Sequence, residues 1–253
     1  MARIKIVLND KYQHLEGFIE DLPLKFMQSG EVIYSGRNTI KIFDVAGLTL
    51  NVKSFKKPLL INQIAYAFFR KSKAERSYLY ASMLEENGFH TPVPVAYMEL
   101  KKCGLFKYSL YISIHEQFDG MMRELLHGTV EEHEELLRQF AHYTATLHEK
   151  KILHLDYSSG NILYKQINNK YTFYLVDLNR MEFNKNIDIN TGCFNFRRLW
   201  GSDEMISFFV KEYARARNFD EATCLRKTFE YRNKFWSSYC KKHPGATPYR
   251  GQI

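Results

Sequence analysis

The sequence predicts an α+β protein with two lobes, an antiparallel sheet in the first half of the chain and mainly helices in the second. Residues 32–53 and 95–114 alternate apolar and polar side chains around turns that contain glycine, which is typical of antiparallel hairpins. After about residue 120 the apolar residues recur with helical spacing instead. We therefore expect a strand-rich lobe over residues 1–118 and a helix-rich lobe over residues 119–253.

The first lobe should hold two helices among its strands. A short helix is expected to end near Pro23, because proline has no amide proton with which to continue a helix. A second helix should begin after Ser72, an N-cap residue followed three positions later by Glu75, and should end at Gly88. The first helix is expected at 12–22, and strands are expected at 4–8, 32–34, 40–45, 48–53, 95–100 and 105–114.

The second lobe should open with a long amphipathic helix. Thr129 and Glu132 form a capping box, and the acidic first turn suits the positive end of the helix dipole. One stripe of this helix should be buried, formed by Leu136, Leu137, Phe140, Ala141, Thr144 and Leu147.

Composition narrows the class of protein. The chain has 253 residues, 45% of them apolar and 25% charged, which is typical of a folded globular protein and excludes a disordered or collagen-like one. Four cysteines without paired spacing argue against a disulfide framework and a zinc site, and favour the cytoplasm. No signal peptide or membrane-spanning run is visible. The net charge of +8 is compatible with binding to nucleic acid, to an anionic membrane or to a phosphorylated small molecule, and with plain solubility.

One group of polar residues carries the functional prediction. The pattern His154-x-Asp156-x4-Asn161 precedes a strand, and a second strand over 171–176 returns after a turn and delivers Asp177 at its end. Phosphoryl transfer needs a carboxylate to orient the nucleophile, here Asp156, and an amide and a second carboxylate to hold Mg²⁺ on ATP. We expect His154 to brace the loop by hydrogen bonding. In the alternative interpretation, these side chains are only turn formers and a loop cap.

The first lobe offers residues for the nucleotide. Lys53 ends the third strand of the run that begins at residue 32, where kinases place the phosphate-contacting lysine, and the preceding loop with Gly36 and Arg37 would cover the nucleotide. That loop has only one glycine. Glu75 is a candidate partner for Lys53, although its carboxylate could instead close the capping box with Ser72.

At these residues the chain resembles the protein-kinase-like superfamily and, more narrowly, the lipopolysaccharide core kinase (Kdo/WaaP) family. The likeness covers roughly residues 30–200 and rests on the segments GFHTPVP (88–94), LHEKKILHLD (147–156) and LVDLNR (175–180). Members of that family use ATP and magnesium to phosphorylate a sugar hydroxyl, on Kdo or heptose, of the lipopolysaccharide inner core at the cytoplasmic face of a Gram-negative inner membrane. The resemblance implies a two-lobed protein-kinase-like fold, with Asp156 as catalytic base, Asn161 and Asp177 as metal ligands, and Lys53 on the α- and β-phosphates.

The sequence departs from the pattern of regulated protein kinases. The metal motif is Asp-Leu-Asn, not Asp-Phe-Gly, and relatives place the helix glutamate nearer to Tyr78 or Leu79 than to Glu75. Only about 17 residues separate Asp177 from Phe194, too few for a peptide-docking segment. A small or lipid-linked sugar acceptor is therefore favoured.

Residues 59–69 are apolar and aromatic and are flanked by lysines and arginines, which suits a helix lying on an anionic membrane surface. A helix packed on its own lobe would have the same pattern. We expect a lipopolysaccharide core sugar kinase that contacts the membrane peripherally and binds no nucleic acid. A kinase of a soluble small molecule, a RIO-like protein kinase and a catalytically weak pseudokinase scaffold are the alternatives. Which sugar and which hydroxyl react, the oligomeric state and the role of residues 200–253 stay open.

Overall fold

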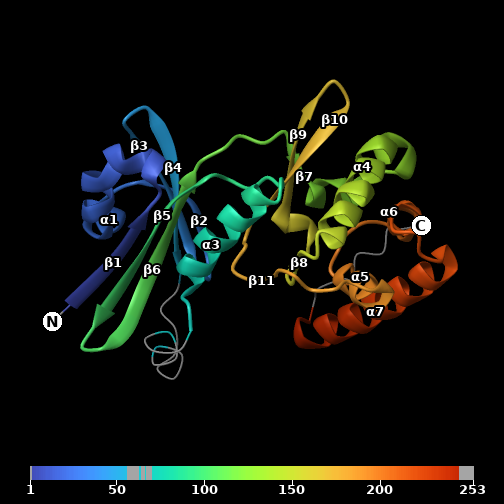
Figure 1. Ribbon diagram of the computed structural model, residues 1–253. Coiled ribbons are helices and arrows are strands. Elements are labelled where there is room, and N and C mark those ends of the chain that lie inside the picture. The colour runs from blue at the N-terminus through green and yellow to red at the C-terminus, as the bar shows by residue number, and fades with distance from the viewer. Residues whose placement is uncertain (1, 56–62, 64–65, 67–69, 245–253) are drawn as a thin grey trace. The chain divides into compact units, whose positions relative to one another are not determined.

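The computed structural model describes residues 2–55, 63, 66 and 70–244, and it divides into two compact units, Met1–Gln117 and Phe118–Ile253 (Figure 1). Most of the apolar segment 59–69 lies outside the described residues, so its predicted membrane contact stays a prediction. Among the helices that the structure does describe, none is both long and apolar enough to cross a membrane.

Unit 1 is built on a six-stranded sheet with the order β1-β5-β6-β4-β3-β2, in which every neighbouring pair is antiparallel. The elements are β1 (Ala2–Leu8), the 3₁₀ helix η1 (Asp10–Leu15), α1 (Glu16–Gln28), β2 (Glu31–Ser35), β3 (Thr39–Val45), β4 (Leu48–Phe55), α3 (Lys73–Glu86), β5 (Pro94–Lys102) and β6 (Leu105–Ile114). The predicted α+β class and antiparallel first lobe are confirmed.

Helices α1 and α3 cover opposite faces of this sheet (Figure 1). Ile19 and Leu22 of α1 are fully buried against one face, in a core that includes Val52 of β4. Ala74 of α3 packs against Phe55 of β4 on the other face. Because side chains alternate along a strand, Lys53 lies on the same face as Phe55, the face that α3 covers.

The first helix is longer than the sequence predicts. It runs from Glu16 to Gln28 with Pro23 inside it, so the expected end near Pro23 is wrong. Pro23 removes one helical hydrogen bond. Burial of Ile19 and Leu22 before it, and packing of Phe26 against the same core after it, outweigh that loss.

The caps of α3 follow the sequence signals. Ser72 accepts a hydrogen bond from the backbone N–H of Glu75 at 3.1 Å. At the other end Gly88 has a φ of +82°, and the N–H of Phe89 donates to the carbonyl of Leu84 at 2.9 Å. This left-handed C-terminal turn needs a residue without a Cβ penalty, which explains the glycine.

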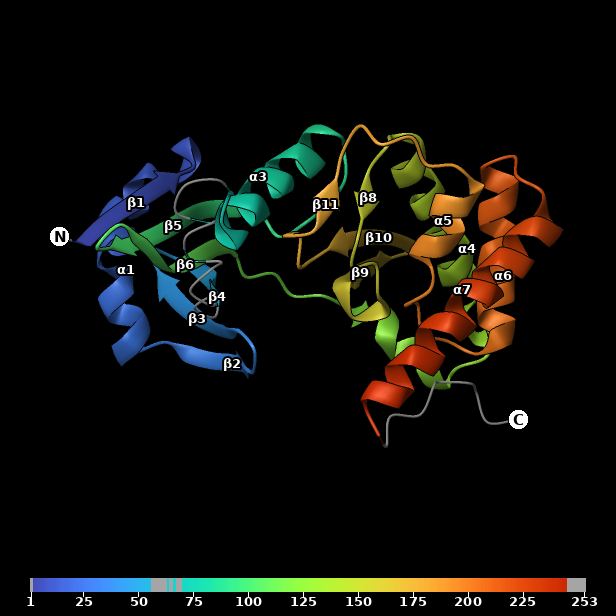
Figure 2. The ribbon, with the colours of Figure 1, turned by 90° about the horizontal axis from the view of Figure 1, so that it is seen from below.

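Unit 2 combines two small sheets with a group of helices, in which α4 contacts α6, and α7 contacts both α5 and α6 (Figure 2). The sheets have the orders β10-β9-β7 and β11-β8. The elements are β7 (Gly120–Met121), η2 (Met122–His127), α4 (Val130–Glu149), β8 (Leu153–His154), η3 (Ser159–Asn161), β9 (Ile162–Ile167), β10 (Lys170–Leu175), β11 (Met181–Glu182), α5 (Ile189–Asn195), α6 (Asp203–Ala216) and α7 (Glu221–Lys242).

Aromatic packing forms the core between α4 and α6. The predicted stripe of α4 is buried in full. The ring of Phe140 stacks on Phe209 with centroids 4.9 Å apart, and Phe196 meets Phe209 edge-on at 5.0 Å. Such pairs contribute about 0.5–1.5 kcal/mol beyond their burial. This core supports the loop that begins at residue 155.

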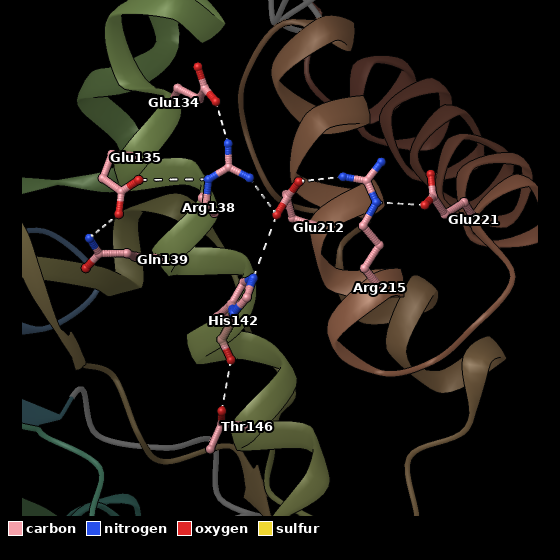
Figure 3. Close-up of polar contacts among 9 residues, drawn as sticks. All are labelled: Glu134, Glu135, Arg138, Gln139, His142, Thr146, Glu212, Arg215 and Glu221. Carbon is pink, nitrogen blue, oxygen red and sulfur yellow. Dashed lines mark hydrogen bonds and ion pairs between the residues drawn. The ribbon is translucent and has the colours of Figure 1, made fainter.

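A buried carboxylate joins the polar sides of α4 and α6 (Figure 3). Only 7% of the Glu212 side chain is exposed, and its two oxygens contact Arg138 at 3.0 Å and Arg215 at 2.8 Å. Arg138 also contacts Glu134, and His142 lies 3.7 Å from Glu212. The guanidinium groups of Arg138 and Arg215 compensate the desolvated charge of Glu212. Removing either arginine should therefore lower the stability of unit 2.

Two glycine substitutions in unit 1 should change stability in opposite directions. Gly88→Ala places a Cβ in open space but at a φ of +82°, so it should destabilise unit 1 by about 1 kcal/mol. Gly17→Ala, in open space within α1, should stabilise it by about 0.5 kcal/mol. Urea unfolding of the two variants measures both changes, and shifts in the same direction would contradict this account.

Candidate active site

The loop between β8 and β9 brings Asp156 and Asn161 together. The side-chain amide Nδ2 of Asn161 donates to the backbone carbonyl of Asp156 at 2.9 Å. The backbone N–H of Asn161 donates to the backbone carbonyl of Ser158 at 2.8 Å. These bonds close the loop into a compact turn. They also leave the amide oxygen of Asn161 directed away from that carbonyl.

The register of the β9–β10 hairpin places Asp177 beside Asn161, as the spacing predicts. Leu175 pairs with Ile162, and the N–H of Val176 donates to the carbonyl of Asn161 at 3.0 Å. Asp177 follows with a φ of +59°, and one of its carboxylate oxygens accepts a hydrogen bond from Asn179 at 2.7 Å. An aspartate whose backbone lies in the left-handed region costs free energy, and such backbone conformations concentrate at functional sites.

His154 connects the two segments through both ring nitrogens. Nδ1 accepts the backbone N–H of Asp156 at 3.1 Å, so Nε2 carries the proton and donates to the carbonyl of Val176 at 3.1 Å. Complete burial lowers the pKa of His154, although the bond to Val176 opposes that shift. The neutral ring therefore braces the loop, in agreement with the bracing role expected from the sequence.

A second buried histidine lies behind the loop. The ring of His148 stacks on Phe196, and its Nδ1 lies 2.9 Å from the hydroxyl of Tyr213. Burial, helped by the charge of Arg217, lowers the pKa of His148 to about 3. Nearby, Asn195 donates to the carbonyl of His154 at 2.9 Å. Sequence reasoning missed Asn195, because no local pattern marks it.

Asn161 and Asp177 offer a fitting donor set for Mg²⁺. The ion prefers oxygen ligands, and it commonly takes one or two from the protein and the others from substrate phosphates and water. The amide oxygen of Asn161 and the second carboxylate oxygen of Asp177 suit this role. Within the described residues no group of three histidine, cysteine, aspartate or glutamate side chains could hold a metal.

The nucleotide residues predicted from the sequence lie in unit 1. Lys53 is on β4, opposite Ile40 of β3 and Tyr111 of β6, and its ammonium group lies 5.4 Å from the ring centroid of Phe55. Gly36 and Arg37 are exposed in the turn between β2 and β3. A Cβ on Gly36 would stand 2.6 Å from the Tyr34 hydroxyl.

Glu75 contacts two residues that the sequence does not suggest. Its carboxylate forms an ion pair with Lys5 of β1 at 3.4 Å and accepts a hydrogen bond from the Tyr97 hydroxyl at 3.3 Å. The pKa of Lys5 is raised, because its contacts with Tyr97 and Glu75 outweigh the opposing effect of burial. Sequence reasoning missed Lys5, which lies on a strand far from α3 in the chain.

The sequence also gave no sign of Arg198. Its guanidinium Nη1 contacts the Oδ1 of Asp156, and the two side chains are 34% and 20% exposed. The loop itself has no lysine or arginine between Asp156 and Asn161. The cation beside Asp156 is therefore supplied by a distant segment.

Comparisons with known proteins show the family and the fold of the chain. The model of the lipopolysaccharide kinase (Kdo/WaaP) family matches residues 24–215, about three-quarters of the chain. A solved structure of WaaP in complex with acyl carrier protein has a TM-score of 0.62 and 16% sequence identity, and the match covers 92% of this chain and 99% of that one. At this identity the likeness shows the fold, and it supports the predicted fold class. No curated protein matches the chain.

The buried His148 should make stability depend on pH. Its pKa is about 3 in the folded chain and near 6.5 when unfolded, so the unfolded chain binds more protons between these values. This contribution to stability is fully present above pH 6.5 and falls as the pH drops. Between pH 7.5 and 5, wild type should lose roughly 2 kcal/mol more than His148→Phe, which keeps a ring against Phe196.

Denaturant unfolding at several pH values measures this difference. Tyr213→Phe serves as the control, because it removes the hydroxyl partner of His148 and keeps the buried imidazole, so it should retain the steep slope. Equal slopes for wild type and His148→Phe would show that the ring does not stay neutral.

Proposed function

The chain belongs to the lipopolysaccharide kinase (Kdo/WaaP) family, and we propose that it transfers the γ-phosphoryl group of ATP to a hydroxyl of an inner-core sugar, Kdo or heptose. Family membership supports phosphotransferase activity in lipopolysaccharide biosynthesis. One observation carries the finer proposal: Asp156, Asn161 and Asp177 are held in one site by the bonds of Asn161 to Asp156 and of Val176 to Asn161.

In the proposed reaction Asp156 orients the acceptor hydroxyl and receives its proton. The hydroxyl oxygen bonds to the γ-phosphorus while the bond from that phosphorus to the bridging oxygen breaks, so ADP leaves. Asp156 suits this role because its side chain is partly exposed while its backbone carbonyl is fixed by Asn161. Positioned proton acceptors of this kind typically contribute 10²–10⁴-fold to the rate.

Asn161 and Asp177 would hold Mg²⁺ through their oxygen atoms. When bound, the ion neutralises the charge that develops on the phosphates. The bond from Asn179 fixes one oxygen of Asp177, which restricts rotation of the carboxylate. The chain thereby holds both side chains in place before any ligand binds, which reduces the entropy cost of binding.

The residues of unit 1 that we assign to ATP are Lys53, Gly36 and Arg37. Lys53 is on the third strand of the β2–β3–β4 run and on the face covered by α3, an arrangement like that of kinases. Glu75 stays in the proposal as a candidate partner of Lys53, and its contacts with Lys5 and Tyr97 tie α3 to β1 and β5.

With an inner-core sugar as the acceptor, the proposed reaction would take place at the cytoplasmic face of the inner membrane. Members of the family phosphorylate an inner-core sugar there, and a peripheral membrane contact would give access to a lipid-linked acceptor. Acyl carrier protein, present with the similar solved WaaP, is a candidate partner on the strength of the shared fold. A soluble acceptor or a protein substrate would instead leave the lipopolysaccharide unchanged when the gene is deleted.

Mass spectrometry of lipopolysaccharide tests the function. A deletion strain should lack one inner-core phosphate, and wild-type protein with Mg²⁺ and ATP should restore it to the extracted lipopolysaccharide. Asp156→Asn should lower this transfer at least 100-fold while ATP still binds, because it keeps the shape and removes the proton acceptor. An intact phosphate pattern in the deletion strain, or full transfer by Asp156→Asn, would contradict the proposal.

Asp177→Asn should weaken nucleotide binding specifically in the presence of Mg²⁺. Asparagine tolerates the left-handed backbone at this position, so the change removes the charge and keeps the fold. We expect titration calorimetry to give about tenfold weaker binding of MgATP or more, and unchanged binding of ATP in EDTA. Asp220→Asn, at the N-cap of α7, is the matched control, because asparagine caps a helix equally well.

A further inference from the structure

The segment from Asn195 to Trp200 lies along the loop that carries Asp156. Asn195 donates to the carbonyl of His154 at 2.9 Å, and the N–H of Trp200 donates to the hydroxyl of Ser159 at 2.9 Å. Between these two bonds, Arg198 forms a parallel backbone bridge with Ser158. Three separate contacts therefore hold residues 195–200 in a fixed position beside the loop.

Arg198 uses this position to contact the side chain of Asp156. Its Nη1 meets Oδ1 of the carboxylate, and that oxygen is shielded from solvent although the Asp156 side chain is 20% exposed. The exposed fraction of the side chain therefore lies elsewhere than at Oδ1. Oδ1 faces the guanidinium, which leaves Oδ2 as the carboxylate oxygen for an acceptor.

Helix α7 contacts the guanidinium group of Arg198. Arg198 lies 5.7 Å from the ring centroid of Phe235, a distance at which a cation is attracted to the ring face. Arg232, also on α7 and only 4% exposed, donates to the carbonyl of Leu199. The position of Arg198 thus depends on a helix that lies beyond the matched family region, which ends at residue 215.

We propose that Arg198 is the positioning residue of Asp156: it holds Oδ1 so that Oδ2 is presented to the acceptor hydroxyl. This inference rests on the proposed role of Asp156. The loop has no cation of its own, and a lone carboxylate on a turn could rotate about two side-chain torsions. The contact with Arg198 restricts that rotation before the acceptor binds, and misplacing a reacting group by about 1 Å can cost on the order of 100-fold in rate.

The test compares three substitutions of Arg198 in the full chain. Arg198→Ala should lower kcat about 100-fold and change the KM for ATP less than about twofold, because the nucleotide residues are untouched. Arg198→Lys should retain more activity than Arg198→Ala. Guanidinium ion at a non-denaturing concentration should restore activity to Arg198→Ala, where a cavity remains, but not to Arg198→Met, whose side chain fills that space.

Arg197→Ala is the matched control. Arg197 donates to the carbonyl of Phe194 at 2.9 Å and stacks over its ring, and neither contact involves Asp156. This variant should keep wild-type kcat. A thermal melt accompanies every variant, and Arg198→Met decides the outcome if Arg198→Ala fails to fold, because it keeps an apolar stem against Phe235 and removes only the charge.

Two results would overturn the inference. Wild-type kcat in folded Arg198→Met would show that the contact does not position Asp156. A higher kcat in Arg198→Ala or Arg198→Met would show that Arg198 blocks the carboxylate. Either result, found together with an inactive Asp156→Asn, would remove the role of Arg198 and leave the proposed function standing. An active Asp156→Asn would instead remove the proposed base itself.

Discussion

The geometry of the site depends on one buried imidazole. His154 accepts from the backbone of Asp156 and donates to the carbonyl of Val176, so it ties the loop to the strand end that precedes Asp177. The N–H of Asp156 can reach Nδ1 only while that nitrogen has a lone pair, and burial favours this neutral form. Because a protonated ring would place two donors opposite each other, the spacing of the two carboxylates depends on a dry environment around His154.

The aromatic core supplies that environment. Tyr157, the residue after Asp156, is fully buried, stacks on Phe140 and shares a hydrogen bond with Thr144 at 2.8 Å. Burial raises the pKa of its hydroxyl, which keeps it neutral. Alternate residues of the loop thus face the α4 and α6 core and the solvent, and core packing fixes the direction in which Asp156 points.

The C-terminal helix extends this support to the outer side of the loop. Arg232 and Phe235 of α7 hold the segment that contains Leu199 and Arg198, and Arg198 contacts Asp156. A buried arginine is costly unless it is paired, and burial lowers the pKa of Arg232 to about 10. The bond to a backbone carbonyl offsets part of that cost, which explains a charged residue inside the last helix of the chain.

The sequence by itself determined the features that depend on near neighbours in the chain. Helix caps such as Ser72, the β9–β10 hairpin and the short spacing from Asp156 to Asn161 are local, so their residue types suffice to predict them. Only the tertiary structure decided that α1 continues through Pro23, that Glu75 pairs with Lys5, and that Arg198 meets Asp156. Each of these features depends on contacts between segments far apart in sequence. There, burial and charge compensation outweigh any local preference.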